Sequence, residues 1–146
     1  MTSPYVIVIA GPPGVGKTTL SKMLSEHFNC NYLSEDEIAK EVFPNVYKDI
    51  EDYPDKLNIA ENQLSKRAKE IFDSGRYVVI DKINLERGFI EEMKKTFHKQ
   101  LILWVLWPPM ETTIERDKRR AGWTSGEDTI RRFYIKYDEL SASLTS

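Results

Sequence analysis

The chain has 146 residues, of which 40% are hydrophobic and 30% are charged, as in one ordinary globular domain. This composition excludes a disordered tail, a collagen-like chain and a coiled coil. With one cysteine and two histidines, the chain cannot form an internal disulfide or a His/Cys zinc site, which is typical of a cytoplasmic protein. The net charge of −2 argues against a surface coated by nucleic acid. No apolar run approaches the roughly 18 residues that span a bilayer, so we expect no membrane partner.

Apolar runs and helical patterns alternate along the chain. Residues 5–10 form an unbroken, mostly β-branched run, which predicts a parallel strand buried on both faces. Ser34 and Glu37 have the spacing of a capping box, which predicts a helix running toward Phe43. The other expected elements are helices over 16–28, 57–72, 89–97, 108–120 and 130–140, and strands at 31–33, 77–80 and 101–106, the last one buried.

Strands that alternate with helices predict an α/β domain with right-handed crossovers. We expect a three-layer sandwich around a four-stranded parallel sheet in the order 2-3-1-4. The whole chain, residues 1–146, is expected to form this single domain, with a lid at about 116–127.

Between the first strand and the first helix lies a phosphate-binding loop. Its residues match G-x-x-x-x-G-K-[ST], in which backbone N–H groups surround a phosphate at the start of a helix. The nucleotide-binding residues expected here are Gly11, Pro12, Pro13, Gly14, Val15, Gly16, Lys17, Thr18 and Thr19. Lys17 is expected to reach the β- and γ-phosphates of ATP, and the Thr18 hydroxyl to bind Mg²⁺. The alternative is a chance glycine turn before a helix.

Other classes of phosphate-loop protein fit less well. A GTPase needs N-K-x-D and D-x-x-G motifs, and neither occurs. A motor ATPase of the AAA+ type carries an Asp-Glu pair at the end of a later strand and a helical lid domain. Here the strand at 77–80 ends in Asp81 and Lys82, so a motor is disfavoured.

Two acidic residues follow predicted strands, at the sheet edge where ligands of such folds bind. Asp36 lies in the first turn of its helix, where it could accept the proton of an acceptor hydroxyl. Its alternative role is to complement the helix dipole. Asp81 could contact Mg²⁺ through water or bind the acceptor, or it could be a solvated residue at a strand end.

A strongly basic segment lies near the C-terminus, around Arg116, Arg119 and Arg120. Arg116 and Arg120 are four residues apart, which predicts that they project from one face of a helix and can neutralise a phosphoryl group in transfer. The alternative is a solvated helix end. Arg119 should point elsewhere, and Trp123 could stack on adenine or shield the site.

The order of these motifs resembles the small P-loop kinases of the 5′-polynucleotide kinase group, within the AAA_33 and zeta-toxin-like kinases. The resemblance implies a general base at Asp36, an acceptor-side strand end at Asp81 and Asn84, and lid arginines at Arg116 and Arg120. The family places an arginine three residues after the base, whereas this chain has Ala39.

The acceptor is the part of the function that the sequence leaves open. Residues 34–62 hold nine acidic and three basic residues, whereas residues 116–136 hold seven basic and three acidic ones. The resemblance puts the 5′-OH end of a nucleic acid first. The alternatives are a small molecule, namely a nucleoside, sugar acid, nucleotide sugar or antibiotic, and a non-catalytic nucleotide-binding switch.

Overall fold

The computed structural model describes residues 4–83, 85–120 and 124–145. One parallel sheet with the order β2-β3-β1-β4 forms the middle layer, which confirms the predicted order. Its strands are β1 (Val6–Ala10), β2 (Asn31–Ser34), β3 (Val78–Lys82) and β4 (Leu101–Val105). No helix among the described residues has the length and apolarity needed to cross a membrane.

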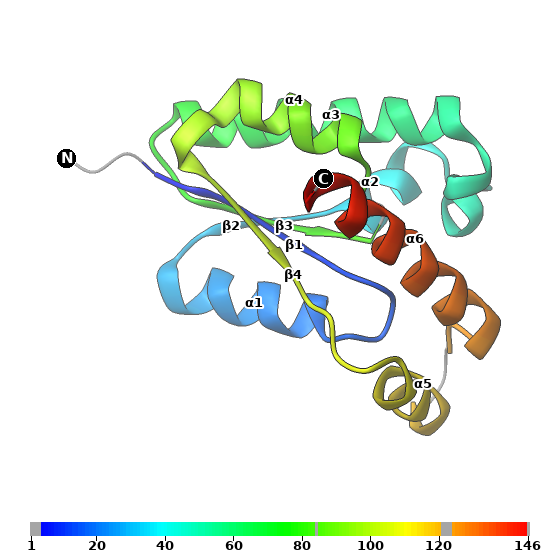
Figure 1. The fold of residues 1–146 in the computed structure, drawn as a ribbon. Helices are drawn as coiled ribbons and strands as arrows, with labels where there is room; N and C mark the ends of the chain where they lie inside the picture. The colour runs from blue at the N-terminus through cyan, green and yellow to red at the C-terminus, as the bar shows by residue number, and fades with distance from the viewer. Residues whose placement is uncertain (1–3, 84, 121–123, 146) are drawn as a thin grey trace.

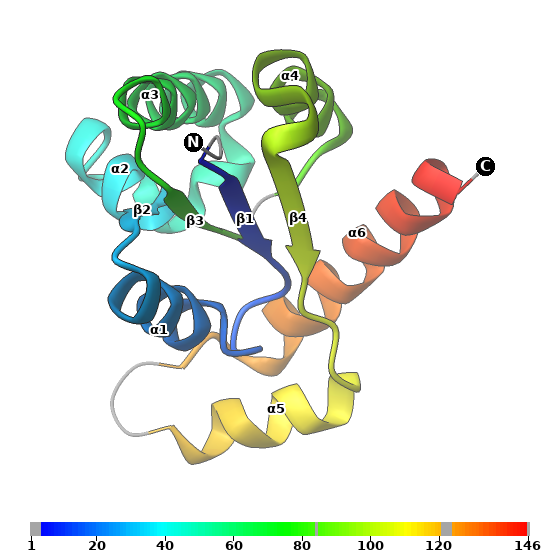
Figure 2. The ribbon, with the colours of Figure 1, turned by 90° about the vertical axis from the view of Figure 1, so that its left-hand side faces the viewer.

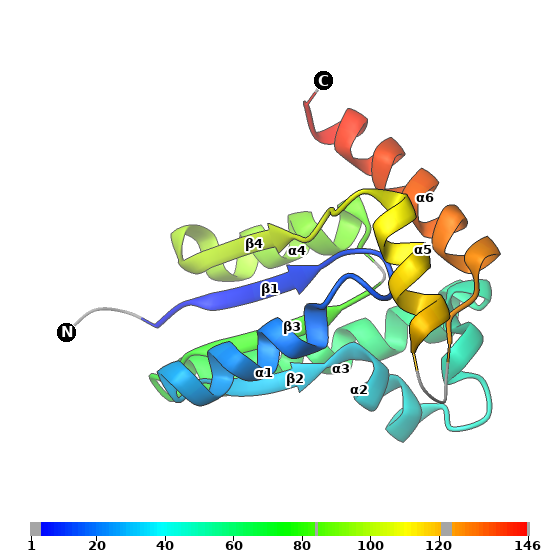
Figure 3. The same cartoon turned by 90° about the horizontal axis from the view of Figure 1, so that it is seen from below.

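Helices cover both faces of this sheet. They are α1 (Lys17–Phe28), α2 (Glu35–Val42), α3 (Pro54–Asp73), α4 (Arg87–Phe97), α5 (Met110–Arg119) and α6 (Glu127–Thr145), with 3-10 turns η1 (Tyr47–Asp52) and η2 (His98–Gln100). Helices α3 and α4 lie on one face and α1 on the other, as Figures 1 and 2 show. Helices α2, α5 and α6 and the turn η1 lie beyond the carboxyl ends of the strands (Figure 3).

The central strands are buried on both faces, as their apolar runs predict. Val8 and Ile80 pack in one cluster with side chains of α3, α4 and α6, and Ile9 and Val79 pack on the opposite face toward α1.

Strand β4 differs from the expectation of a buried strand. Among the described residues it pairs only with β1, so it forms an edge of the sheet, and Trp104 and Val105 are 47% and 39% exposed.

Strand β3 extends two residues beyond the predicted strand at 77–80. Its register pairs Asp81 with Ile9 on one side and with Ser34 on the other. Ser34 caps α2, since its hydroxyl accepts a hydrogen bond from the Glu37 amide at 3.3 Å, which confirms the predicted helix start. Pairing Ser34 with Asp81 therefore brings the first turn of α2 close to the end of β3.

Candidate active site

The phosphate loop lies between β1 and α1, as predicted. Gly11 passes so close to the chain after β4 that a Cβ atom there would lie 2.6 Å from the Leu106 carbonyl oxygen. Gly16 has a φ of +97°, in the left-handed region that favours glycine. The glycines of the motif therefore satisfy steric needs of the loop, and α1 begins directly after it at Lys17.

Lys17 is buried within this loop, and its ammonium donates a hydrogen bond to the Pro12 carbonyl at 3.0 Å. Burial lowers the pKa of Lys17, while Asp81 and Asp36 oppose that shift through their negative charges. The positive charge of Arg120 lowers the pKa further. Lys17 therefore lies within electrostatic range of all three of these candidate site residues.

Thr18 and Asp81 are direct neighbours. The Thr18 hydroxyl donates to Asp81 Oδ2 at 2.7 Å, and the Tyr32 hydroxyl donates to the same oxygen at 2.9 Å. A hydroxyl and a carboxylate beside a phosphate loop are the hard oxygen ligands that Mg²⁺ takes, with phosphate oxygens and waters completing its shell. The residues present thus fit the predicted metal position, although Tyr32 is a partner that sequence reasoning missed.

Asp36 lies in the first turn of α2, at the edge of a cavity. Its side chain is accessible from that cavity, yet partial removal from bulk water raises the pKa of its carboxyl to about 6. The negative charges of Glu35, Asp81 and Glu51 contribute to the rise, and Lys17 opposes it. A carboxyl with such a pKa can accept a proton near neutral pH.

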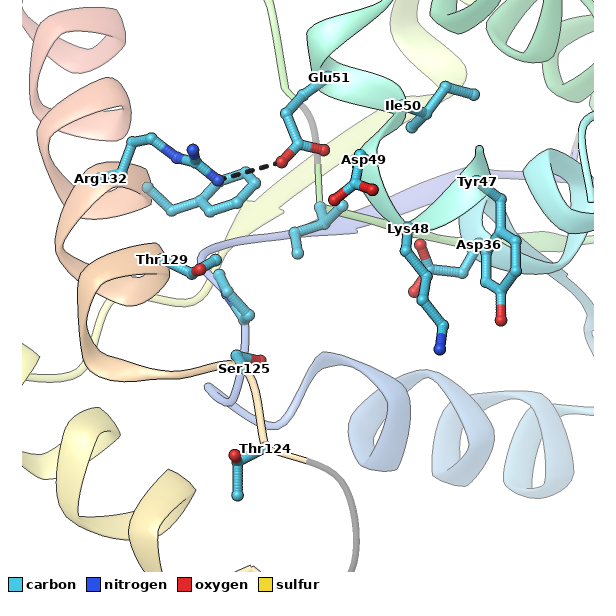
Figure 4. Close-up of a pocket in the computed structure, with 13 residues that line it drawn as sticks. Asp36, Tyr47, Lys48, Asp49, Ile50, Glu51, Thr124, Ser125, Thr129 and Arg132 are labelled. Atoms are coloured by element: carbon cyan, nitrogen blue, oxygen red, sulfur yellow. Dashed lines mark hydrogen bonds and ion pairs between the residues drawn. The ribbon is translucent and has the colours of Figure 1, made fainter. Parts of the chain in front are cut away.

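The cavity has a volume of about 580 Å³ and lies between η1, α6 and the phosphate loop. Its lining residues are Pro13, Asp36, Tyr47, Lys48, Asp49, Ile50, Glu51, Ile83, Thr124, Ser125, Thr129, Arg132 and Phe133. Figure 4 shows Arg132 on α6 paired with Glu51 of η1. In the sequence Arg132 belongs to the basic segment near the C-terminus, and no pattern links it to Glu51, because the cavity wall joins elements that are far apart in the chain.

A buried ion cluster supports the strand end and α2. The Lys82 ammonium is fully buried, forms an ion pair with Glu35 and lies 2.8 Å from Glu61 Oε2. Glu35 also accepts a hydrogen bond from the Ile83 amide at 3.1 Å. This cluster ties α2, whose first turn carries Asp36, to β3 and α3.

Tyr137 of α6 connects the phosphate loop to the end of β3. Its hydroxyl accepts from the Gly11 amide at 3.0 Å and donates to the Ile83 carbonyl at 2.8 Å. The hydrophobic pattern predicts Tyr137 only as an inward residue of the last helix. The hydrogen bonds show that it also anchors the loop.

Helix α5 ends at Arg119, one residue before the predicted end, and Arg120 is its C-cap residue. The φ of Arg120 is −67°, as in a helix, and its amide donates to the Asp117 carbonyl at 3.2 Å, so only the chain after Arg120 leaves the helical path. That Arg116 and Arg120 share one face stays a prediction. Asp117 is buried and accepts hydrogen bonds from the amides of Ser125 and Gly126 at 2.8 and 2.9 Å. These bonds draw residues 125 and 126 back against α5.

Ala39, at the position where the family has an arginine, is buried. It packs with Ile50, Leu57 and Ala60 in a small apolar cluster. An arginine on this helix turn would therefore disturb the packing of α2 against η1 and α3. Two other predicted positions, Asn84 and Trp123, lie outside the described residues.

The sequence is similar to known proteins over most of its length. The sequence model of the family AAA_33, described as "AAA domain", matches residues 6–133. A putative adenylate kinase of Thermococcus onnurineus is 39% identical over 77 residues, which cover 52% of this chain and 39% of that protein. The chain thus spans about two fifths of the length of this curated relative.

Solved structures share the fold. A gluconokinase from Sinorhizobium meliloti matches with a TM-score of 0.73 and 19% identity, over 92% of this chain and 75% of that chain. A chain of the Pnkp1/Rnl/Hen1 RNA repair complex matches with a TM-score of 0.72 and 16% identity, over 98% of this chain and 47% of that chain. At these identities the likeness establishes the P-loop kinase fold.

Proposed function

Since the chain belongs to the AAA_33 family, we propose that it is an ATP-dependent kinase that phosphorylates a hydroxyl group. One observation carries this proposal: Asp36, whose pKa is about 6, faces a cavity that the phosphate loop also lines through Pro13. A carboxyl in this position can act as a general base toward a hydroxyl acceptor, because the hydroxyl loses its proton during phosphoryl transfer.

In this proposal the loop amides and Lys17 hold the phosphates of ATP. Thr18 and Asp81 would hold Mg²⁺, which would supply positive charge at the β- and γ-phosphates. Asp36 takes the proton of the acceptor hydroxyl, whose oxygen forms a bond to the γ-phosphorus. The bond from that phosphorus to the β–γ bridging oxygen breaks, and ADP leaves. Arg116 and Arg120 are the candidates to neutralise the transferring group.

We place a small-molecule hydroxyl first among the acceptors. A volume of about 580 Å³ lies within the roughly 300–1,000 Å³ of small-molecule sites. The walls carry carboxylates from Asp36, Asp49 and Glu51, which disfavour a phosphate chain. The gluconokinase that shares the fold acts on a small molecule, as its name states.

The 5′-OH end of a nucleic acid is the second candidate acceptor. Beside the cavity, Lys40 and Lys48 lie 5.8 and 6.0 Å from the centre of the Tyr47 ring. A ring flanked by two cations could stack a terminal base and hold a nearby phosphate. The order of the lid residues, and the likeness to the RNA repair chain over 98% of this chain, support the same candidate.

The deciding experiment offers ATP labelled at the γ-phosphate, with Mg²⁺, to candidate acceptors side by side. These are a 5′-OH oligonucleotide, a nucleoside, gluconate, shikimate and a nucleotide sugar. Label on a small molecule alone supports the first candidate, and label on the oligonucleotide alone supports the second. Tight ATP binding without transfer to any acceptor would contradict the kinase proposal and favour a nucleotide-binding switch.

A further inference from the structure

We infer that the cavity beside Asp36 selects an uncharged or amine-bearing polyhydroxylated alcohol and discriminates against acceptors that carry a phosphate or carboxylate. The inference rests on the proposed function, and it names the chemical class of the acceptor at that site. It follows from the charges of the cavity wall, the partners of the nearby cations and the hydroxyl groups opposite the carboxylates.

The charged groups on the wall are three carboxylates and two cations. Asp36, Asp49 and Glu51 supply the carboxylates, and Lys48 and Arg132 supply the cations. Arg132 Nη2 lies 3.2 Å from Glu51 Oε1 across the cavity (Figure 4), so its charge is already matched. An anionic acceptor would have to compete with Glu51 for this guanidinium.

The cations behind the wall also have partners. Lys82 is fully buried between Glu35 and Glu61, and Lys17 belongs to the phosphate loop. The family's arginine position is occupied by Ala39, which faces an apolar cluster. None of these three residues offers a cation to an acceptor anion.

Neighbouring carboxylates also make the electrostatic potential at Asp36 negative. Glu35, Asp81 and Glu51 each raise the pKa of the Asp36 carboxyl, and Lys17 is the cation that opposes them. A second anion bound beside Asp36 would meet the same repulsion. At an effective dielectric constant of about 20, one like charge about 6–12 Å away lowers affinity on the order of 10- to 100-fold.

Opposite the carboxylates, the cavity offers groups that bind hydroxyls. Thr124, Ser125 and Thr129 line this side. Carboxylates accept hydrogen bonds from alcohols, hydroxyls both donate and accept, and an amine would pair with a carboxylate. Phe133 and Ile83 supply an apolar surface for the carbon skeleton.

The test uses two series of acceptors, and the members of each series differ at one substituent that is anionic, neutral or an amine. One is D-gluconate, D-sorbitol and D-glucamine; the other is adenosine 3′-monophosphate, adenosine and 3′-amino-3′-deoxyadenosine, which share a 5′-OH. Binding is measured by calorimetry with a non-hydrolysable ATP analogue and Mg²⁺, and transfer is measured separately with labelled ATP. In at least one series we expect the neutral and amine members to bind 10-fold or more tightly than the anionic member.

Substitutions of wall carboxylates test whether they cause this preference. Glu51→Gln removes one carboxylate and releases Arg132, so the anionic member should gain about 10-fold in affinity while the amine member loses affinity. Asp49→Asn should shift the preference in the same direction. Glu92→Gln, on the exposed side of α4, is the matched control and should change the affinity of neither the anionic nor the amine member. Independently of any acceptor, carbon-13 NMR should find a lower pKa for Asp36 in Glu51→Gln.

The outcomes separate the inference from the proposed function. Charge-dependent binding without phosphate transfer would leave the inference standing and overturn the kinase proposal. Phosphate transfer together with tighter binding of the anionic members would support the kinase proposal and overturn the inference. Binding of no member in either series, or an unchanged Asp36 pKa in Glu51→Gln, would overturn the inference as well.

Discussion

The Thr18 hydroxyl donates to the Asp81 carboxylate at 2.7 Å, which joins the phosphate loop to the end of β3 across 63 positions of sequence. Thr18 follows a glycine-rich loop and Asp81 ends a buried strand, and β1 and β3 pair directly. The parallel pairing of these two strands therefore brings together the two oxygen ligands proposed for Mg²⁺.

Asp81→Asn should raise the Mg²⁺ concentration that gives half-maximal activity. An amide keeps a hydrogen-bond acceptor for Thr18 but removes the negative charge, and loss of such a supporting group typically costs about 10- to 100-fold in metal affinity. Thr18→Ser keeps the hydroxyl and is the conservative control. The measurement is a Mg²⁺ titration of the rate, and an unchanged titration in Asp81→Asn would remove this residue from the metal site.

Lys17→Met should reduce turnover by at least about 10³-fold, because it removes the positive charge proposed to lie at the β- and γ-phosphates. Lys22→Met, which changes an exposed lysine of the same helix, should keep full activity. Steady-state kinetics on the best acceptor measure both variants, with circular dichroism to show that each one is folded. A Lys17→Met protein with normal kcat would contradict the phosphate role.

Asp36→Asn should lower kcat by about 10²–10⁴-fold while ATP affinity stays nearly unchanged, as expected for the loss of a general base. Glu37→Gln changes the neighbouring carboxylate and should keep near-normal kcat.

The pH dependence of the wild-type rate should follow the Asp36 carboxyl, whose raised pKa is about 6. The carboxyl accepts a proton only when ionised, so kcat/KM for the acceptor should fall as the pH drops through about 6. In Asp36→Asn this acid limb should disappear. A wild-type profile that is flat between pH 5 and 8 would show that another group, or none, takes the proton.

Arg120→Lys should lower kcat more than it raises the KM for ATP, because a lysine keeps the charge but loses the planar fork of donors. Arg116→Lys should show the same pattern if both arginines reach the transferring group. Arg119 pairs with Glu115 at 3.9 Å on the exposed side of α5, so Arg119→Lys is the control. Full kcat in both Arg116→Lys and Arg120→Lys would reduce the segment to a solvated helix end.

Lys82→Met should destabilise the protein by about 3–5 kcal/mol, since it leaves the buried carboxylates of Glu35 and Glu61 without their cation. Lys69→Met removes an exposed ion pair with Asp73 and should cost at most about 1 kcal/mol. Urea denaturation followed by circular dichroism measures both changes. Similar values for the two variants would show that the buried cluster contributes no more than a surface pair.

Local patterns determined much of the fold. The apolar run at 5–10, the glycine loop before Lys17 and the cap at Ser34 each depend on residues next to one another in the chain. Such signals act through backbone conformation and short-range hydrogen bonds, which hold wherever the segment lies. This is why the strands, the helices and the position of the phosphate loop were predictable, along with Asp36 in a first helical turn.

The tertiary structure decided how distant residues combine. The pairing of Lys82 with Glu35 and Glu61, and the hydrogen bond from Gly11 to Tyr137, join positions up to 126 residues apart. Parallel register and helix packing bring these groups together, and no pattern of neighbouring residues encodes them.

The same holds for the proposed acceptor cavity and for the chain after α5. Asp117 binds the amides of Ser125 and Gly126, which lie eight and nine positions later, and so fixes how the chain returns after the helix. Glu51 and Arg132 are 81 positions apart, yet their contact shapes the charge of the cavity. The sequence by itself thus predicts the phosphate loop, whereas the charged wall of the cavity arises only because the tertiary structure brings η1 and α6 together.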